Sequence, residues 1–272
     1  MPDQPYVRYD APAVFGPSLM PDISPASFAE TSAIVFETTE DAARKLLPRF
    51  YELERPVITI YRLTYQGMNY LAGGEYREAV ICVDASYNGP DETIKAPFGA
   101  VLWVDQVQAL VSGRELLGSP KVHGRFPTEE VGPGSRSFEV YESDGYNINA
   151  RLMRGEWSNL KELDAASLAK LNERIKITNT LGWKIIPSMD GPHDADYPTV
   201  IVMSWKFDQA SYGEGRITFD TPDPQHAPVG SRIMRVLAGM PIKEYRTGLV
   251  ARGTAVVERA STRRLAMPPG VV

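Results

Sequence analysis

The chain has 272 residues, 43% hydrophobic and 23% charged, which is enough for one large domain or two small ones. Its formal net charge of −5 argues against a nucleic-acid-binding surface, which needs clustered basic residues. No apolar stretch reaches the ~20 residues of a membrane span, and the first five residues lack the features of a signal peptide. The single cysteine, Cys82, excludes an intrachain disulfide. We therefore expect a cytoplasmic protein with neither a nucleic acid nor a membrane as partner.

The first half of the chain predicts an arm, several strands and one helix. Residues 1–27 hold many prolines and little periodicity, so we expect an extended N-terminal arm. A helix is expected to open at residues 39–41 and to end at Pro48. The β-branched and aromatic segments predict strands, at residues 32–37, 56–65, 76–87 and 96–111.

The second half continues this pattern and sets the fold class. A hairpin is expected over residues 138–153, joined through Asp144-Gly145. Helices are expected at residues 164–176 and 229–237, and strands at residues 184–187, 199–208, 216–219 and 243–258. Many strands with few helices favour an α+β fold, in which a single domain over residues 28–265 holds an antiparallel sheet that curls or closes.

A short turn in the middle of the chain immediately precedes Lys121. Ser112 and Glu115 have the S-x-x-E spacing of a capping box, which predicts a helix that starts there. Gly118 can end that helix in the left-handed conformation. Pro120 then pushes the preceding residue toward an extended conformation. The pattern predicts a stiffly bounded turn that positions Lys121.

Two interpretations of Lys121 follow from its surroundings. An apolar environment would favour the uncharged amine, which can attack a ketone to form a Schiff base. Alternatively, the ammonium group lies in solvent, as most lysines do. Spacing alone favours the solvated interpretation.

Alternation along the strand at residues 76–87 predicts a second candidate. Tyr76, Glu78, Val80 and Cys82 share one face of that strand. A glutamate at the more solvent-exposed end of a central strand is well placed to line a cavity beside Tyr76. The alternative is a carboxylate at the rim of the sheet, held in a salt bridge.

Other catalytic motifs are missing from the sequence. The three histidines have no ligand spacing, so neither zinc nor another metal is expected. The chain has no G-x-S-x-G motif, and Gly132-Pro133-Gly134 lacks the third glycine of a dinucleotide loop. We expect no cofactor. His123 follows Lys121 closely, and a surface position is favoured for it over a role as proton carrier.

The lysine turn resembles a known family. Gly113-Arg114-Glu115-Leu116, followed by Pro120-Lys121, is similar to the signature of acetoacetate decarboxylases, in which this lysine forms an imine. The resemblance extends in the same order over about residues 30–258. It is carried by Tyr76-Arg77-Glu78 with Ser86-Tyr87-Asn88-Gly89, by Lys184-Ile185-Ile186-Pro187 with Asp190-Gly191, and by Met240-Pro241-Ile242-Lys243-Glu244. It implies an antiparallel β-barrel or cone with outer helices, a homo-oligomer, and an active-site glutamate at Glu78.

Three positions depart from the family pattern. Val122 replaces a second lysine, Ala29 an active-site arginine and Tyr61 a second glutamate. These changes resemble divergent branches of the superfamily that condense pyruvate with an aldehyde and then dehydrate the product. The partner of the substrate carboxylate is left open between Arg114 and Arg77, although Arg114 is also suited to bracing the turn.

The sequence thus predicts a Schiff-base lyase of the acetoacetate decarboxylase-like superfamily. Lys121 is the expected nucleophile and Glu78 the proton-transfer group, with Tyr76, Tyr61 and Arg114 as substrate-binding residues. The expected substrate is a small keto acid, either decarboxylated or, if it is pyruvate, condensed with an aldehyde co-substrate. The alternative is a non-catalytic β-barrel that binds a small molecule.

Overall fold

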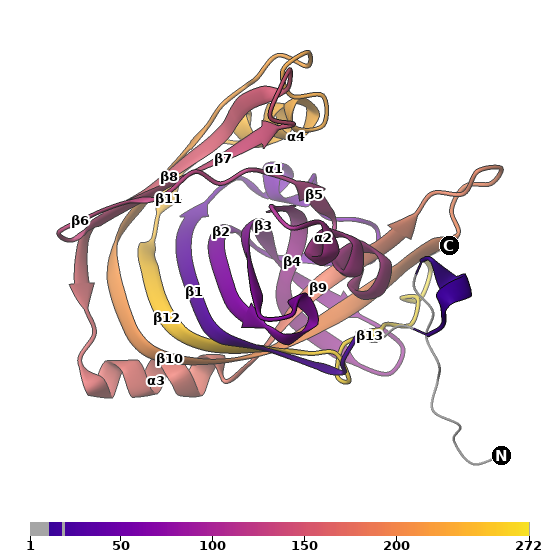
Figure 1. Cartoon of the computed structure of the whole chain (residues 1–272), viewed down its shortest axis with the longest axis horizontal. Helices are drawn as coiled ribbons and strands as arrows, with labels where there is room; N and C mark the ends of the chain where they lie inside the picture. The colour runs from indigo at the N-terminus through magenta and orange to yellow at the C-terminus, as the bar shows by residue number, and fades with distance from the viewer. Residues whose placement is uncertain (1–10, 18–19, 272) are drawn as a thin grey trace.

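One thirteen-stranded sheet dominates the structure, a computed structural model that describes residues 11–17 and 20–271 (Figure 1). Its strands are β1 (Ile23–Glu37), β2 (Glu52–Met68), β3 (Gly74–Asn88), β4 (Thr93–Val104), β5 (Lys121–His123), β6 (Glu130–Gly132), β7 (Ser135–Ser143), β8 (Asn149–Glu162), β9 (Ile177–Ile186), β10 (Ala195–Phe219), β11 (Glu244–Tyr245), β12 (Thr247–Glu258) and β13 (Arg263–Arg264). The strands expected at residues 199–208 and 216–219 are parts of the single long strand β10.

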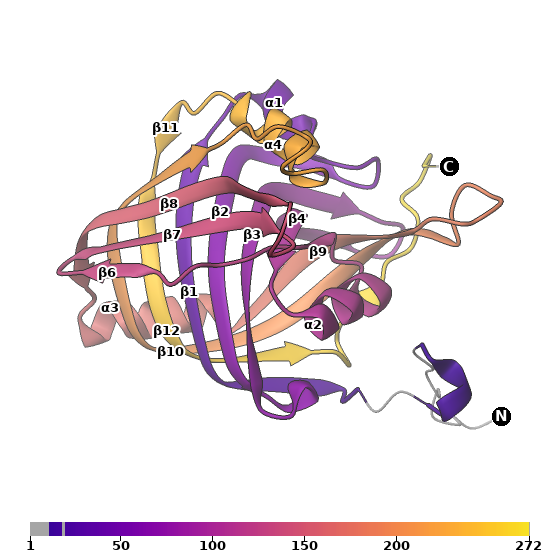
Figure 2. The same ribbon diagram turned by 45° about the horizontal axis from the view of Figure 1, so that its top comes forward.

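Seven of these strands pair in a closed ring. The pairing runs from β1 through β2 and β3 to β4, then through β9, β10 and β12 back to β1. The hairpin of β7 and β8 pairs with β10 and passes over the outside of β1, β2 and β3 (Figures 1 and 2). The ring gives the sheet an inner and an outer face.

The sheet is mixed, which corrects the predicted antiparallel arrangement. β4 runs parallel to β9, through the pair Phe98 and Leu181, and parallel to β5. Parallel neighbours need a crossover connection, and here the chain passes through four strands and two α-helices between β4 and β9. Turn signals identify hairpins between consecutive strands, but they carry no information about this distant pairing.

Strand alternation divides the apolar side chains between the two faces. On β1, Ile34 and Phe36 are fully buried in the main core, which they share with Trp157 of β8 and Met234 of the last helix. The Trp157 ring nitrogen donates a 3.1 Å hydrogen bond to the carbonyl of Ala33, which ties the β7–β8 layer to the ring. The main core therefore lies outside the ring, and the inner face is left to line a cavity.

Four α-helices lie around the sheet in the described part of the chain. They are α1 (Glu40–Arg44), α2 (Val107–Ser112), α3 (Ala165–Ile175) and α4 (Gly230–Ala238). The side chains of Thr39 and Asp164 accept hydrogen bonds from the first turns of α1 and α3, so both predicted helix starts are confirmed. Among the described residues, no helix has the length and apolar character needed to cross a bilayer.

The segment before the lysine turn differs from the prediction. β4 ends at Val104, α2 begins at Val107 with Gln106 as its N-cap, and Ser112 is already helical without a capping hydrogen bond. The helix continues as a π-helical segment (Gly113–Leu117) and ends at Gly118, whose φ is 75°. The predicted strand to residue 111 and the predicted helix start at Ser112 are therefore wrong, because an apolar run does not distinguish a strand from a buried helix. The predicted stop at Gly118 is confirmed.

The N-terminal arm is described in part. A short 3₁₀ turn (Ala13–Phe15) precedes β1, which begins at Ile23 opposite Glu258. Residues 23–27 of the predicted arm therefore belong to the sheet. The expectation for residues 1–10 and 18–19 lies outside the described residues.

Candidate active site

Lys121 is the first residue of β5 and pairs with Leu102 of β4. Its side chain is only 7% exposed. Gly113 lies directly against it, since a Cβ atom at Gly113 would stand 2.4 Å from Cδ of Lys121. Two carbon atoms pack at about 3.5–4.0 Å, so the glycine leaves room for the lysine side chain.

Strand β9 holds the turn that carries Lys121. The backbone N–H of Trp183 on β9 donates a 3.0 Å hydrogen bond to the carbonyl of Gly118. The ammonium group of Lys184 on the same strand donates to the carbonyl of Glu115. The turn is thus fixed to β9, and this fixes where Lys121 enters the interior.

Glu78 is the partner of Lys121. It lies on β3, opposite Leu63 of β2 and Val104 of β4, and is 5% exposed. The ammonium Nζ of Lys121 donates a hydrogen bond to Oε1 of Glu78 and forms an ion pair with it. Forty-three positions of sequence separate these two residues, and the fold brings them into direct contact.

Aromatic rings surround this pair. Nζ of Lys121 lies 5.4 Å from the centre of the Tyr76 ring, and the Tyr65 ring packs against Tyr76 at 4.9 Å. Burial, and after it the negative charge of Glu78, raises the pKa of both tyrosines well above the usual value. The two phenols therefore remain protonated at neutral pH, where a phenol can donate a hydrogen bond.

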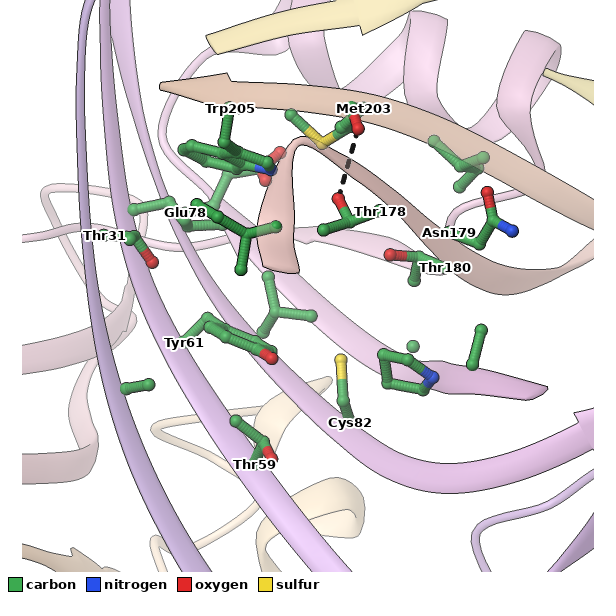
Figure 3. A pocket seen from close by; sticks show the side chains of 18 of the residues that line it. Thr31, Thr59, Tyr61, Glu78, Cys82, Thr178, Asn179, Thr180, Met203 and Trp205 are labelled. Carbon is green, nitrogen blue, oxygen red and sulfur yellow. Dashed lines mark hydrogen bonds between the residues drawn. The ribbon is translucent and has the colours of Figure 1, made fainter. Parts of the chain in front are cut away.

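A cavity of about 630 Å³ opens from the lysine–glutamate pair into the inside of the ring. Figure 3 shows Met203 and Trp205 on one side, and Tyr61 and Cys82 on the other. Burial is the main cause that raises the pKa of Tyr61 above its usual value. Charged side chains are few among the described lining residues: Glu78, Lys95, Lys121 and Arg174. The cavity is thus mainly apolar, with one buried ion pair at Lys121.

The structure brings four of the five predicted site residues together. Lys121, Glu78, Tyr76 and Tyr61 all line the cavity. Arg114 is exposed on the π-helical segment and is absent from the described lining, so the structure does not bring this residue to the cavity. In this segment Gly113 is buried against Lys121, whereas Arg114 faces the exterior.

Arg77 and Ala29 also supply no cation to the cavity. Arg77 lies on the opposite face of β3 from Glu78, and its guanidinium donates to the carbonyl of Phe126 at 3.1 Å. Ala29 is fully buried in an apolar cluster. Two lining cations that the sequence did not suggest are Lys95 on β4 and Arg174 at the end of α3. The side chain of Arg174 reaches the cavity from the helix. Its helical position was predictable, but its place at the cavity depends on how α3 packs on β10.

Ser119 is a further lining residue that the motif reasoning missed. It is 5% exposed, lies two residues before Lys121, and lines the same cavity. Its position in the lysine turn could have identified it as a residue of the site. His123, by contrast, is exposed, as expected.

Solved structures share this fold. Acetoacetate decarboxylase from Legionella pneumophila matches with a TM-score of 0.71 and 18% identity, over 92% of each chain. The enduracididine biosynthesis enzyme MppR, complexed with the condensation product of pyruvate and imidazole 4-carboxaldehyde, matches with a TM-score of 0.69 and 18% identity. That match covers 98% of this chain and 99% of MppR. At these identities the likeness establishes an acetoacetate decarboxylase-like fold.

Sequence comparison assigns the family. The family described as acetoacetate decarboxylase matches residues 10–260, and the chain therefore belongs to the acetoacetate decarboxylase family. A curated relative, decarboxylase DEC1 of Cochliobolus heterostrophus, is 34% identical over 92 residues. That match spans about a third of the relative's length, 34% of it and 34% of this chain.

Proposed function

We propose that this protein is an imine-forming carbon–carbon lyase that acts on a keto acid through Lys121. The observation that carries the proposal is the buried contact between Nζ of Lys121 and the carboxylate of Glu78, at the inner wall of an apolar cavity. An amine must lose a proton before it can attack a carbonyl carbon. Glu78 is the group placed to take that proton.

The first steps are common to every substrate. The free amine adds to the ketone carbonyl, and the resulting hydroxyl group leaves as water with a proton returned from Glu78. The product is an iminium ion, whose positive nitrogen withdraws electrons from the neighbouring carbons. General acid–base help of this kind contributes roughly 10²–10⁴-fold.

Decarboxylation is the first of two possible outcomes. In a β-keto acid the bond to the carboxylate breaks, CO₂ leaves, and the electron pair forms an enamine while neutralising the nitrogen. Glu78 regains a proton from solvent and transfers it to the enamine carbon, and water then releases the ketone product from Lys121. A cavity with few charges suits this step, because an apolar medium disfavours the carboxylate that is lost. The family and the similarity to a decarboxylase support this outcome.

Condensation with an aldehyde is the second candidate. The iminium of pyruvate loses a methyl proton to Glu78, the enamine attacks the aldehyde carbonyl, and water is then eliminated. The cavity of about 630 Å³ has room for a second reactant beside Tyr61. The fold shared with MppR supports this candidate.

Borohydride trapping tests the proposal. The protein is incubated with acetoacetate or with pyruvate, reduced, digested and examined by peptide mass spectrometry, which distinguishes Lys121 from Lys95, another lysine that lines the cavity. We expect an adduct on Lys121 that is lost in Lys121→Ala and kept in the control Lys206→Ala, an exposed lysine of β10. Release of CO₂ from acetoacetate identifies the decarboxylase. An adduct with pyruvate, without that release, identifies the condensing enzyme. Turnover that survives in Lys121→Ala would exclude the imine mechanism, and no adduct with any keto acid would favour the non-catalytic binding protein.

Three further expectations stay predictions. They are the cytoplasmic location, the homo-oligomer, and the division of the chain into an arm over residues 1–27 and a domain over residues 28–265.

A further inference from the structure

The cavity lining follows β2 and β3 from Tyr65 and Tyr76 to Thr59 and Cys82, and Lys121 contacts Glu78 toward the first end of this run. Three cross-strand pairs line it in succession, Leu63 with Glu78, Tyr61 with Val80, and Thr59 with Cys82. Strand residues advance by about 3.3 Å each. The four steps from Glu78 to Cys82 therefore extend over about 13 Å.

Packed rings close the cavity at the Lys121 end. Beyond Glu78, Tyr76 and Tyr65 are 5% and 2% exposed, with ring centres 4.9 Å apart. The Trp205 ring lies 6.0 Å from Tyr65 and adds to this aromatic wall. A substrate bound at Lys121 consequently has room on the Cys82 side.

The wall toward Cys82 is mainly apolar. Val80, Leu102 and Leu181 line it. Figure 3 shows the thiol of Cys82 together with the hydroxyl groups of Thr59 and Thr180. Burial, together with the charge of Asp84, raises the pKa of the Cys82 thiol to about 12, so the wall carries no thiolate at neutral pH. Such a surface suits a hydrocarbon group.

Lys95 is the lining cation carried by β4, the strand that also contributes Gly99 and Leu102 to the cavity. Its side chain is 65% exposed, and its ammonium group is paired with Glu54 at 2.6 Å. That charge is thus directed to solvent and already neutralised. It leaves the Cys82 side of the cavity suited to an uncharged group.

The volume exceeds what a three- or four-carbon keto acid fills. At about 30 Å³ for each water molecule in the liquid, the 630 Å³ correspond to the room of about 21 waters. Apolar walls without a partner lose dispersion contacts, so a longer substrate gains affinity by filling this space. We infer that the substrate is a β-keto acid with an unbranched hydrocarbon tail, its ketone at Lys121 and its tail directed toward Thr59 and Cys82. This inference rests on the proposed imine chemistry at Lys121 and names its substrate class.

A chain-length series tests the inference. Freshly prepared acetoacetate, 3-oxohexanoate, 3-oxooctanoate and 3-oxodecanoate are compared by initial rates of CO₂ release, corrected for the uncatalysed rate, and by borohydride trapping on Lys121. Each buried methylene is worth about 0.8 kcal/mol, so we expect kcat/KM to rise about fourfold per added methylene until the ~13 Å are filled. A flat series, or a maximum at acetoacetate with Lys121 still trapped, overturns the inference and leaves the proposed function standing. No adduct and no CO₂ release with any of the four acids overturns the proposed function as well.

A variant that narrows the cavity tests where the hydrocarbon tail of the substrate lies. Gly99 pairs with Cys82 and lines the cavity, and a Cβ atom there would meet no atom closer than 3.5 Å. Gly99→Leu thus adds a side chain at the far level without a backbone clash. We expect the ratio of kcat/KM for 3-oxooctanoate to that for acetoacetate to fall at least tenfold. Thr59→Leu, which fills the same level from β2, is the second variant if Gly99→Leu does not fold.

The control is Gly191→Leu in the loop between β9 and β10. A Cβ atom at Gly191 meets its nearest neighbour, Oγ of Ser188, at 3.7 Å, and the residue does not line the cavity. This variant is expected to keep the wild-type ratio. An unchanged ratio in folded Gly99→Leu and Thr59→Leu would show that the tail does not lie toward Cys82 and would overturn the inference.

Discussion

Replacing Gly113 by alanine is expected to lower the activity and to leave the thermal stability almost unchanged. Gly113 has φ −63° and ψ −46°, a helical conformation that alanine adopts freely. Alanine is favoured over glycine in a helix by about 1 kcal/mol. The backbone therefore gives no reason for the fold to be lost.

The added methyl group instead clashes with the side chain of Lys121. It would stand 2.4 Å from Cδ and 2.7 Å from Cε of the lysine. Carbon atoms pack at about 3.5 Å or more, so the side chain has to move by about 1 Å. A misplacement of this size can cost about 100-fold in rate. We expect kcat/KM for CO₂ release or condensation to fall about 100-fold, with the thermal midpoint within about 4 °C of the wild type.

The assay is the rate of borohydride-trapped adduct on Lys121, measured together with thermal unfolding. Gly239→Ala at the end of α4 is the matched control, because Gly239 has φ −80° and its added Cβ atom would meet no atom closer than 3.3 Å. That control is expected to react like the wild type. Trapping at the wild-type rate in Gly113→Ala would refute the reasoning that this glycine positions the lysine.

Three further predictions follow from the site. Glu78→Gln is expected to slow turnover by roughly 10²–10⁴-fold while an adduct on Lys121 stays detectable, and unchanged turnover would remove Glu78 from proton transfer. Arg114→Ala is expected to stay within twofold of the wild-type kcat/KM because the side chain is exposed and outside the described cavity lining, whereas a large rise in KM would restore it as a carboxylate partner. Burial and Asp84 raise the pKa of Cys82 to about 12, so the reactive thiolate is scarce at pH 8. Iodoacetamide should then label Cys82 only after unfolding in guanidinium, and rapid labelling of the folded chain would contradict this picture.

Local signals in the sequence determined much of the fold. The capping positions Thr39 and Asp164 marked two helix starts, and Gly118 marked the end of the lysine turn, because these conformations depend on neighbouring residues alone. Period-two alternation likewise placed Tyr76 and Glu78 on one face of β3. The prediction of the boundary between β4 and α2 was wrong, because apolar residues suit a buried strand and a buried helix equally well.

Long-range contacts required the tertiary structure. The sequence placed Lys121 on a turn and Glu78 on a strand, and only the resemblance to a family implied that they share a site. The pairing of β5 with β4 brings the two side chains into contact, and the packing of α3 on β10 adds Arg174 to the cavity. The size and direction of the cavity depend on the closed ring of strands. No single segment encodes that closure, because it arises from pairings between strands far apart in the chain.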